Sequence, residues 1–139
     1  MSDLAGLSVL TAPLTRSDGA ERWIDLGYDP QVSNQVGAAI AAILSARGVT
    51  VVLSLEGEEE AVLAHVAASA MHARRVTVVQ ERGLLFTSAD LPPESTVALV
   101  ATQLTNFRPL LPVATMMRDR GHRFDCAITL DPPQLHTNL

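Results

Sequence analysis

Lysine is absent from this sequence, so its ten basic residues are all arginine. The absence removes a Schiff-base nucleophile and the lysine of a P-loop. Fifteen acidic residues leave a formal net charge of −5. That balance argues against sequence-independent binding of nucleic acid, which needs a basic protein face. We therefore expect proteins or small molecules as partners, and no nucleic acid.

Cysteine occurs once, at Cys126, so no internal disulfide can form. The first residues carry neither the basic flank nor the apolar run of a secretion signal. No apolar run approaches the roughly 20 residues that cross a bilayer. These absences predict a cytoplasmic protein that makes no use of the membrane, in which Cys126 is a buried thiol. The exclusive use of arginine, with abundant alanine, suggests a bacterial genome rich in GC.

The composition is that of a globular protein, because 47% of the residues are hydrophobic and only 18% are charged. Its 139 residues fit one domain. We expect a single domain over residues 1–139, with an N-terminal arm at 1–22 and a tail at 132–139. Asp131-Pro132-Pro133 is expected to end the sheet.

The order of apolar patterns predicts an α/β fold. Short β-branched runs typical of buried strands occur at 49–54, 76–80, 96–101 and 124–130. Helical spacing of apolar residues predicts helices at 32–47, at 59–72 and from Pro109 to Gly121. Single helices between strands imply right-handed crossovers, hence a doubly wound and mainly parallel sheet. The helix at 32–47 is rich in alanine and weakly charged, which predicts a homodimer or larger assembly.

Ligands of a doubly wound sheet bind beyond the carboxyl ends of its strands, so three loops provide the candidate site residues. These weak candidates for ligand binding are Glu56, Gly57, Glu58, Arg82, Thr102, Thr105, Asn106 and Arg108. The acidic run 56–60 either holds Mg²⁺ or, as we favour, complements the positive end of a helix. Thr105, Asn106 and Arg108 either bind a phosphate at a helix start or serve as caps, the reading we favour.

The sequence resembles the type I phosphoribosyltransferases, in particular the orotate and adenine branch, from about Thr15 to Asp131. The stretch Thr15-Arg16-Ser17-Asp18-Gly19 before Trp23-Ile24-Asp25-Leu26 is similar to the opening of the orotate enzymes. The strand at 97–100, followed by a loop and by 116–121, is similar to the region of the phosphoribosyl diphosphate motif. The resemblance implies a phosphoribosyltransferase-like sheet and a nucleotide or phosphorylated small molecule as ligand.

The sequence departs from the family at its catalytic signature. Two adjacent acidic residues follow this strand in the family, whereas Ala101 and Thr102 stand here. The glycine-rich phosphate turn is replaced by 106–109, where Phe107 is bulky and Pro109 lacks an amide. The family's Arg-Lys-x-Gly becomes 80–83, expected to be a loop, and about fifteen residues separate Gly83 from the next strand, too few for the family's long mobile loop.

These departures predict a degenerate active site and two classes of function. The first, which we favour, is a non-catalytic protein with a binding, regulatory or assembly role linked to nucleotide or phosphoribosyl metabolism. The alternative is an active transferase that joins a nucleobase to phosphoribosyl diphosphate at an atypical site. We expect no catalytic residue, no metal ligand and no cofactor for the first class, and Mg²⁺ only for the second.

Overall fold

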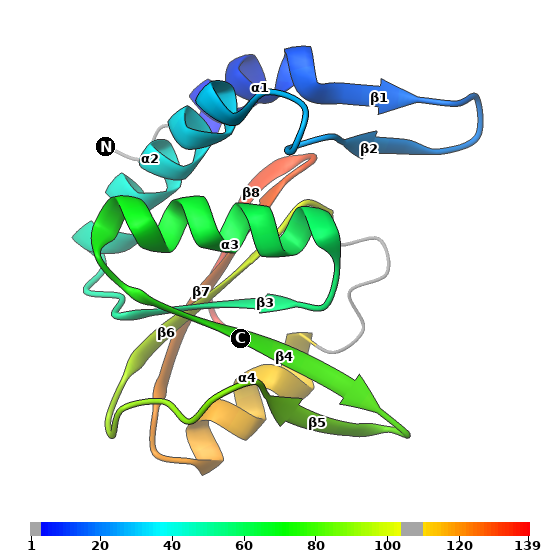
Figure 1. The fold of residues 1–139 in the computed structure, drawn as a ribbon. Helices are drawn as coiled ribbons and strands as arrows, with labels where there is room; N and C mark the ends of the chain where they lie inside the picture. Colours follow the sequence, from blue (N-terminus) through cyan, green and yellow to red (C-terminus); the bar gives the residue numbers. More distant parts are fainter. Residues whose placement is uncertain (1–3, 104–109) are drawn as a thin grey trace.

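A six-stranded sheet forms the centre of this computed structural model, which describes residues 4–103 and 110–139 (Figure 1). The strands lie in the order β5-β4-β3-β6-β7-β8, with bounds Leu84–Thr87, Arg74–Glu81, Val51–Leu55, Thr96–Ala101, Arg123–Leu130 and Pro133–His136. The four inner strands run parallel, and β5 and β8 pair antiparallel at the two edges. The predicted α/β class with a mainly parallel sheet is confirmed.

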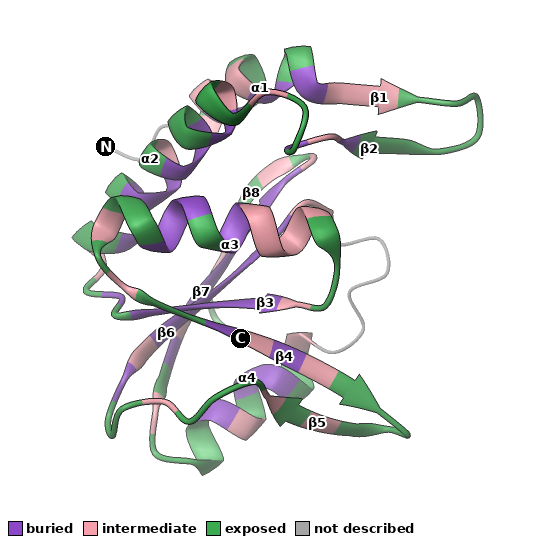
Figure 2. Cartoon of the chain, in the orientation of Figure 1, coloured by how far each residue is buried: buried purple, intermediate pink, exposed green. Residues whose placement is uncertain are grey.

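Helices cover both faces of the sheet, as a doubly wound fold requires (Figure 1). The helices are α1 (Leu4–Thr11), α2 (Pro30–Ala46), α3 (Glu58–Met71) and α4 (Leu110–Asp119). The first three share a core with Val52 of β3, while α4 shares a second core with its neighbours Val51 and Leu53. This alternation places buried side chains on both faces of the central strands (Figure 2).

The helix ends follow from local chemistry. The Asp29 carboxylate accepts hydrogen bonds from the amides of Gln31 and Val32, and Pro30 occupies the first helical position of α2. Three glutamates open α3, and His72 ends it in the left-handed conformation with φ 56°. Among the described residues, no helix combines the length and the hydropathy that crossing a membrane requires.

A second, two-stranded sheet lies above the main one, formed by β1 (Thr15–Ser17) and β2 (Arg22–Ile24) (Figure 1). This β1–β2 hairpin extends beyond the carboxyl ends of the inner strands, on the same side as the turn between β4 and β5. Its base belongs to the core, because Leu14, Ile24 and Leu26 are fully buried against α2 and α3.

The structure differs from the sequence prediction at both ends of the chain. The expected N-terminal arm contains α1, a short 3-10 helix (Ala12–Leu14) and β1, and its Leu7 is fully buried. The expected tail contains β8. Asp131-Pro132-Pro133 does not end the sheet as predicted, because Pro133 is tolerated as the first residue of an edge strand.

The prediction of a loop at 80–83 is wrong for its first two residues, which belong to β4. Strand β4 continues through Gln80 to Glu81, and only Arg82 and Gly83 turn the chain into β5, with φ values of 53° and 77°. Two residues of positive φ make the tight hairpin whose twist matches that of its strands. The prediction of too few residues for a long mobile loop agrees with this geometry.

The homodimer was predicted because the alanine-rich helix at 32–47, which is α2 in the structure, was expected to expose an apolar surface. The structure does not support this reason. The large apolar residues of α2, among them Val36, Ile40 and Leu44, are buried, and its exposed side carries small residues such as Ala38 and Ala42. Helix α2 therefore presents no large apolar patch. Self-association itself stays a prediction.

Candidate functional site

The order in which the chain adds strands to the sheet reverses once, between the neighbouring parallel strands β3 and β6. From β3 the chain moves outward to β4 and β5, and it then returns to the other side of β3 to continue through β6 and β7. The loops that leave β3 and β6 consequently separate to opposite faces, which is where doubly wound folds bind ligands. In this protein Glu60, in the first turn of α3, contacts Thr102, which follows β6.

Glu60 lies in the first turn of α3, and its carboxylate reaches the residue that follows β6. The Thr102 amide donates to Oε2 at 3.0 Å and to Oε1 at 3.3 Å, and the Thr102 hydroxyl donates to Oε1 at 2.5 Å. Gly57, with φ 147°, precedes the helix in a conformation open mainly to glycine. An internal carboxylate thus takes the donors that the carboxyl end of β6 offers.

Burial is the main influence on the charge of Glu60. It raises the pKa of this carboxyl above its ordinary value, although the hydrogen bonds from Thr102 oppose the rise and the negative charge of Glu59 adds to it. Among the described residues, none of the ion pairs involves Glu60. Within the part of the chain that the structure describes, this acid therefore has hydrogen-bond donors and forms no ion pair.

The neighbouring glutamate connects α3 to the β1–β2 hairpin. Glu59 Oε1 accepts a hydrogen bond of 2.7 Å from the amide of Leu26, just beyond β2. The carbonyl of Leu26 in turn accepts a hydrogen bond from the hydroxyl of Ser33 in α2. The acidic start of α3 therefore has specific structural partners on two sides.

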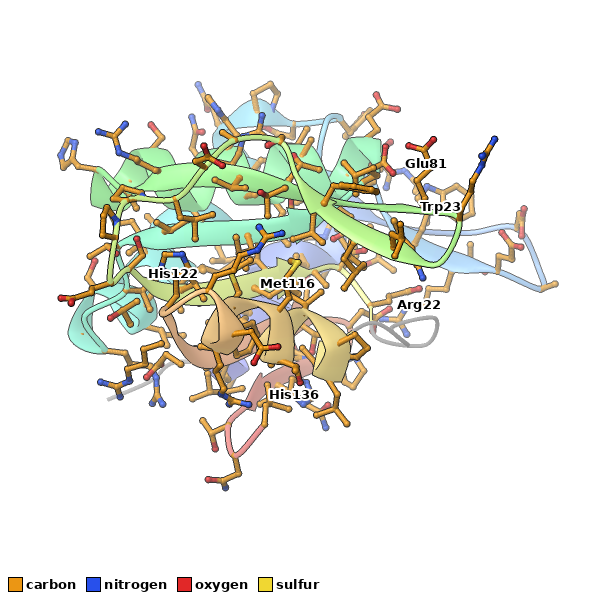
Figure 3. The ribbon with its side chains drawn as sticks, turned by 90° about the horizontal axis from the view of Figure 1, so that it is seen from below. Arg22, Trp23, Glu81, Met116, His122 and His136 are labelled. Atoms are coloured by element: carbon orange, nitrogen blue, oxygen red, sulfur yellow. The ribbon has the colours of Figure 1, made fainter. Side chains whose placement is uncertain are left out.

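A polar cluster ties the same hairpin to the ends of β6 and β7. The Gln103 amide nitrogen donates to the Arg22 carbonyl at 2.7 Å and to Asp131 Oδ2 at 3.3 Å. The Arg22 guanidinium forms an ion pair of 3.2 Å with the same Asp131 oxygen. Figure 3 shows Arg22 and Trp23 at the end of the molecule where Glu81 lies, opposite His122. The space between hairpin and sheet is thus bridged by polar contacts.

Comparison with known proteins relates this architecture to a family. No family model matches the sequence, and no curated protein matches it. Solved structures do match. Adenine phosphoribosyltransferase from Rhodothermus marinus has a TM-score of 0.70 at 11% identity, over 90% of this chain and 85% of that chain. The adenine enzyme from Thermoanaerobacter pseudethanolicus has 0.68 at 15%, over 86% and 84%.

The orotate branch is represented as well. Orotate phosphoribosyltransferase from Mycobacterium tuberculosis, solved with inorganic phosphate, has a TM-score of 0.62 at 19% identity, over 91% of this chain and 74% of that chain. The chain has a type I phosphoribosyltransferase-like fold. Identities this low establish the fold and leave the activity open.

The phosphoribosyltransferase-like fold brings together only some of the residues predicted for the site. Glu56, Gly57 and Glu58 follow β3 as expected, and Glu56 lines a hollow of about 260 Å³ with Leu55, Val78 and Gln80. Glu58 is exposed, and Arg82 lies at the tip of the β4–β5 turn. Thr102 is engaged by Glu60. Thr105, Asn106 and Arg108 lie outside the described residues.

Apart from Thr102, sequence reasoning singled out none of the residues that make the long-range contacts of the site. These are Arg22, Glu59, Glu60, Gln103 and Asp131. Glu59 and Glu60 were noticed only as members of an acidic run. In the parts of the chain that the structure describes, no group of three or more His, Cys, Asp or Glu side chains is placed to hold a metal ion.

Proposed function

We propose that this chain is a non-catalytic phosphoribosyltransferase-like protein with a binding, regulatory or assembly role linked to nucleotide or phosphoribosyl metabolism. The supporting observation is the contact of Glu60 with Thr102. It joins the first turn of α3 to the residue after β6, so a carboxylate lies near the loops for which the resemblance implies binding of a phosphorylated sugar. A bound diphosphate would meet this negative charge, which no ion pair compensates among residues 4–103 and 110–139.

The chemistry of transfer argues in the same direction. The resemblance implies that active members hold the ribose hydroxyls with two acidic residues after this strand, and Ala101 and Thr102 have no carboxylate to offer. Ala101 is buried, and the amide and hydroxyl of Thr102 both donate hydrogen bonds to Glu60. Placed charges supply much of the stabilisation of a transition state, so their loss removes rate as well as affinity.

The β4–β5 hairpin supports the proposal independently. Where the resemblance implies a long loop that closes over the substrate, the chain turns within two residues, Arg82 and Gly83. A cation-like sugar needs protection from water during transfer, and a two-residue turn offers no lid.

Direct assay tests the proposal. Purified protein is incubated with phosphoribosyl diphosphate, Mg²⁺ and each of adenine, guanine, hypoxanthine and orotate, and nucleotide formation is followed by chromatography. We expect no product above a blank without protein, both for this chain and for the variant Ala101→Asp with Thr102→Asp. Turnover by the unmodified chain would refute the proposal and establish the atypical transferase instead.

A binding experiment separates loss of catalysis from loss of the ligand site. Inorganic phosphate and phosphoribosyl diphosphate are titrated against this chain, Glu60→Ala and Glu58→Ala, with the melting temperature as the readout, because a ligand of the native state raises it. We expect stabilisation to appear or increase in Glu60→Ala alone. Glu58→Ala is the matched control, since it removes one charge from the same turn and leaves the Thr102 donors occupied. Equal responses of both variants would contradict the role given to Glu60.

A further inference from the structure

The two edges of the main sheet are protected very differently. Strand β8 begins with Pro133 and packs against α1, two features that hinder pairing with another chain. Strand β5 has the uncharged sequence Leu84-Leu85-Phe86-Thr87 and contains no proline. It is the last strand of the sheet and lies at its free margin (Figure 1). Edges of this kind are templates for pairing with a further strand.

The hydrogen-bond parity of β5 identifies which backbone groups are available. The Ser88 amide donates to the Thr77 carbonyl at 2.8 Å, so the alternating ladder makes Phe86 and Leu84 the bonded partners of β4. The backbone groups of Leu85 and Thr87 therefore point away from the sheet. On that side, no backbone group of the described residues pairs with them.

The side chains of β5 divide between the two faces in a way that favours an apolar partner. Leu85 packs toward the core under α4. Leu84 and Phe86 point to the opposite face, where they are 62% and 47% exposed. Figure 2 shows exposed and half-buried residues along this hairpin, in contrast to the buried inner strands. Two large apolar side chains thus lie beside an unpaired row of backbone groups.

We propose that two copies of this chain associate through antiparallel pairing of their β5 strands, about a twofold axis that passes through Phe86. This register pairs Leu85 with Thr87 of the partner subunit, which joins the outward backbone groups of both strands. Phe86 then faces its own copy at a non-hydrogen-bonded position, where side chains approach most closely. The same strand thereby supplies both halves of the interface, as twofold symmetry requires.

Charge complementarity favours this register and a second copy as the occupant. The chain that flanks β5 carries Arg82 on one side and Asp90 on the other, each four residues from Phe86 and each exposed. Antiparallel pairing centred on Phe86 brings the Arg82 end of each strand toward the Asp90 end of the partner strand, and symmetry repeats this arrangement. Opposite charges across paired strands stabilise their register.

Sedimentation velocity tests the proposal on the full chain. Because only residues 84–88 pair on each side, we expect a dissociation constant on the order of tens of micromolar, with dimer at about 200 µM and monomer at about 2 µM. Phe86→Glu places two like charges opposite each other and should weaken the dimer by about tenfold or more. Leu111→Glu, at a leucine of α4 with 61% exposure, is the matched control and should leave it unchanged. A monomer at the higher concentration, or a dimer that survives Phe86→Glu, would overturn the proposal.

Two further sets of variants test the register. Arg82→Glu and Asp90→Arg should each weaken the dimer, and the double variant should restore it. Under mild oxidation, Phe86→Cys should form a disulfide-linked dimer, because each new thiol faces its own copy. Leu84→Cys, which is similarly exposed but faces Ser88 of the partner subunit, should not. Equal cross-linking of both variants, or failure of the double variant to recover, would refute the twofold axis at Phe86.

Discussion

Two partly buried carboxylates of this protein have pKa values that are shifted in opposite directions. Burial raises the pKa of Asp125, but hydrogen bonding and attraction from Arg47, at 2.5 Å, together with the charge of Arg123, outweigh it and leave the pKa lowered. Among the described residues, Glu60 receives side-chain hydrogen bonds only from Thr102, and burial raises its pKa. The folded state therefore favours the ionised form of Asp125, whereas it disfavours the ionised form of Glu60.

The raised pKa of Glu60 predicts a dependence of stability on pH. The folded state binds this proton more tightly than the unfolded state, so the contribution of Glu60 is fully present below its ordinary pKa of 4.5 and is lost as the pH rises through the raised folded value. Glu60→Gln does not titrate. We expect the free energy of unfolding of Glu60→Gln, relative to the unmodified chain, to increase from pH 4.5 to pH 8 in urea titrations.

Thr102→Val provides the companion measurement. It removes the hydroxyl that lowers the pKa of Glu60, so the dependence of stability on pH should become steeper than in the unmodified chain.

For the Glu60→Gln comparison, a difference in the free energy of unfolding that stays constant from pH 4.5 to pH 8 would show that burial does not perturb the carboxyl.

At the scale of residues, the sequence predicted composition and position better than partnership. An acidic start of the helix after β3 was expected, and the burial of Cys126 is confirmed. The partners of Glu59 and Glu60 lie 33 and 42 residues away along the chain. Contacts over such separations depend on how the β1–β2 hairpin and β6 pack against α3, and no local pattern encodes them.

Among the elements, the contact of α2 with α3 depends on one glycine. A Cβ added to Gly37 would lie 2.6 Å from the backbone carbonyl carbon of Val66, closer than atoms can approach. Glycine inside a helix costs about 1 kcal/mol relative to alanine. The chain accepts this cost because close approach of the two helices buries their facing side chains.

This contact predicts that Gly37→Ala destabilises the protein although alanine favours helix. The added methyl group must push α3 away from α2, and overpacking of this kind costs about 1–3 kcal/mol. Urea unfolding monitored by circular dichroism measures the loss. Gly27→Ala makes the same chemical change where a Cβ meets nothing within 4 Å, and it should leave the free energy of unfolding nearly unchanged. A gain of stability in Gly37→Ala would show that the helices can separate freely.

The elements that the sequence predicted are those with a clear pattern of hydrophobic residues. The inner strands are buried on both faces, and β-branched runs mark such strands directly. The missed elements are short or lie at edges. Strand β5 has four residues with apolar side chains on both faces, β8 begins with proline, and α1 is apolar without a clear polar side. Their structure comes from packing on the finished sheet.

On the scale of the whole molecule, the β1–β2 hairpin belongs to the main core. Ile24 of β2 and the flanking residues Leu14 and Leu26 are fully buried among residues of α2, α3 and the sheet. Glu59 and Gln103 add hydrogen bonds of 2.7 Å to backbone atoms of the hairpin region. The hairpin is therefore held by apolar burial and by polar bridges together.

This arrangement predicts that hairpin and sheet unfold as one cooperative unit. Trp23, the single tryptophan, lies on β2 and reports the hairpin by fluorescence, while far-ultraviolet circular dichroism reports the whole chain. In urea, both signals should give the same midpoint, as two-state unfolding requires. Glu59→Ala leaves the Leu26 amide without its acceptor, so it should lower the free energy of unfolding by about 1–3 kcal/mol. Both urea midpoints should therefore fall together. A fluorescence transition at lower urea, in either protein, would mean that the hairpin opens while the sheet stays folded.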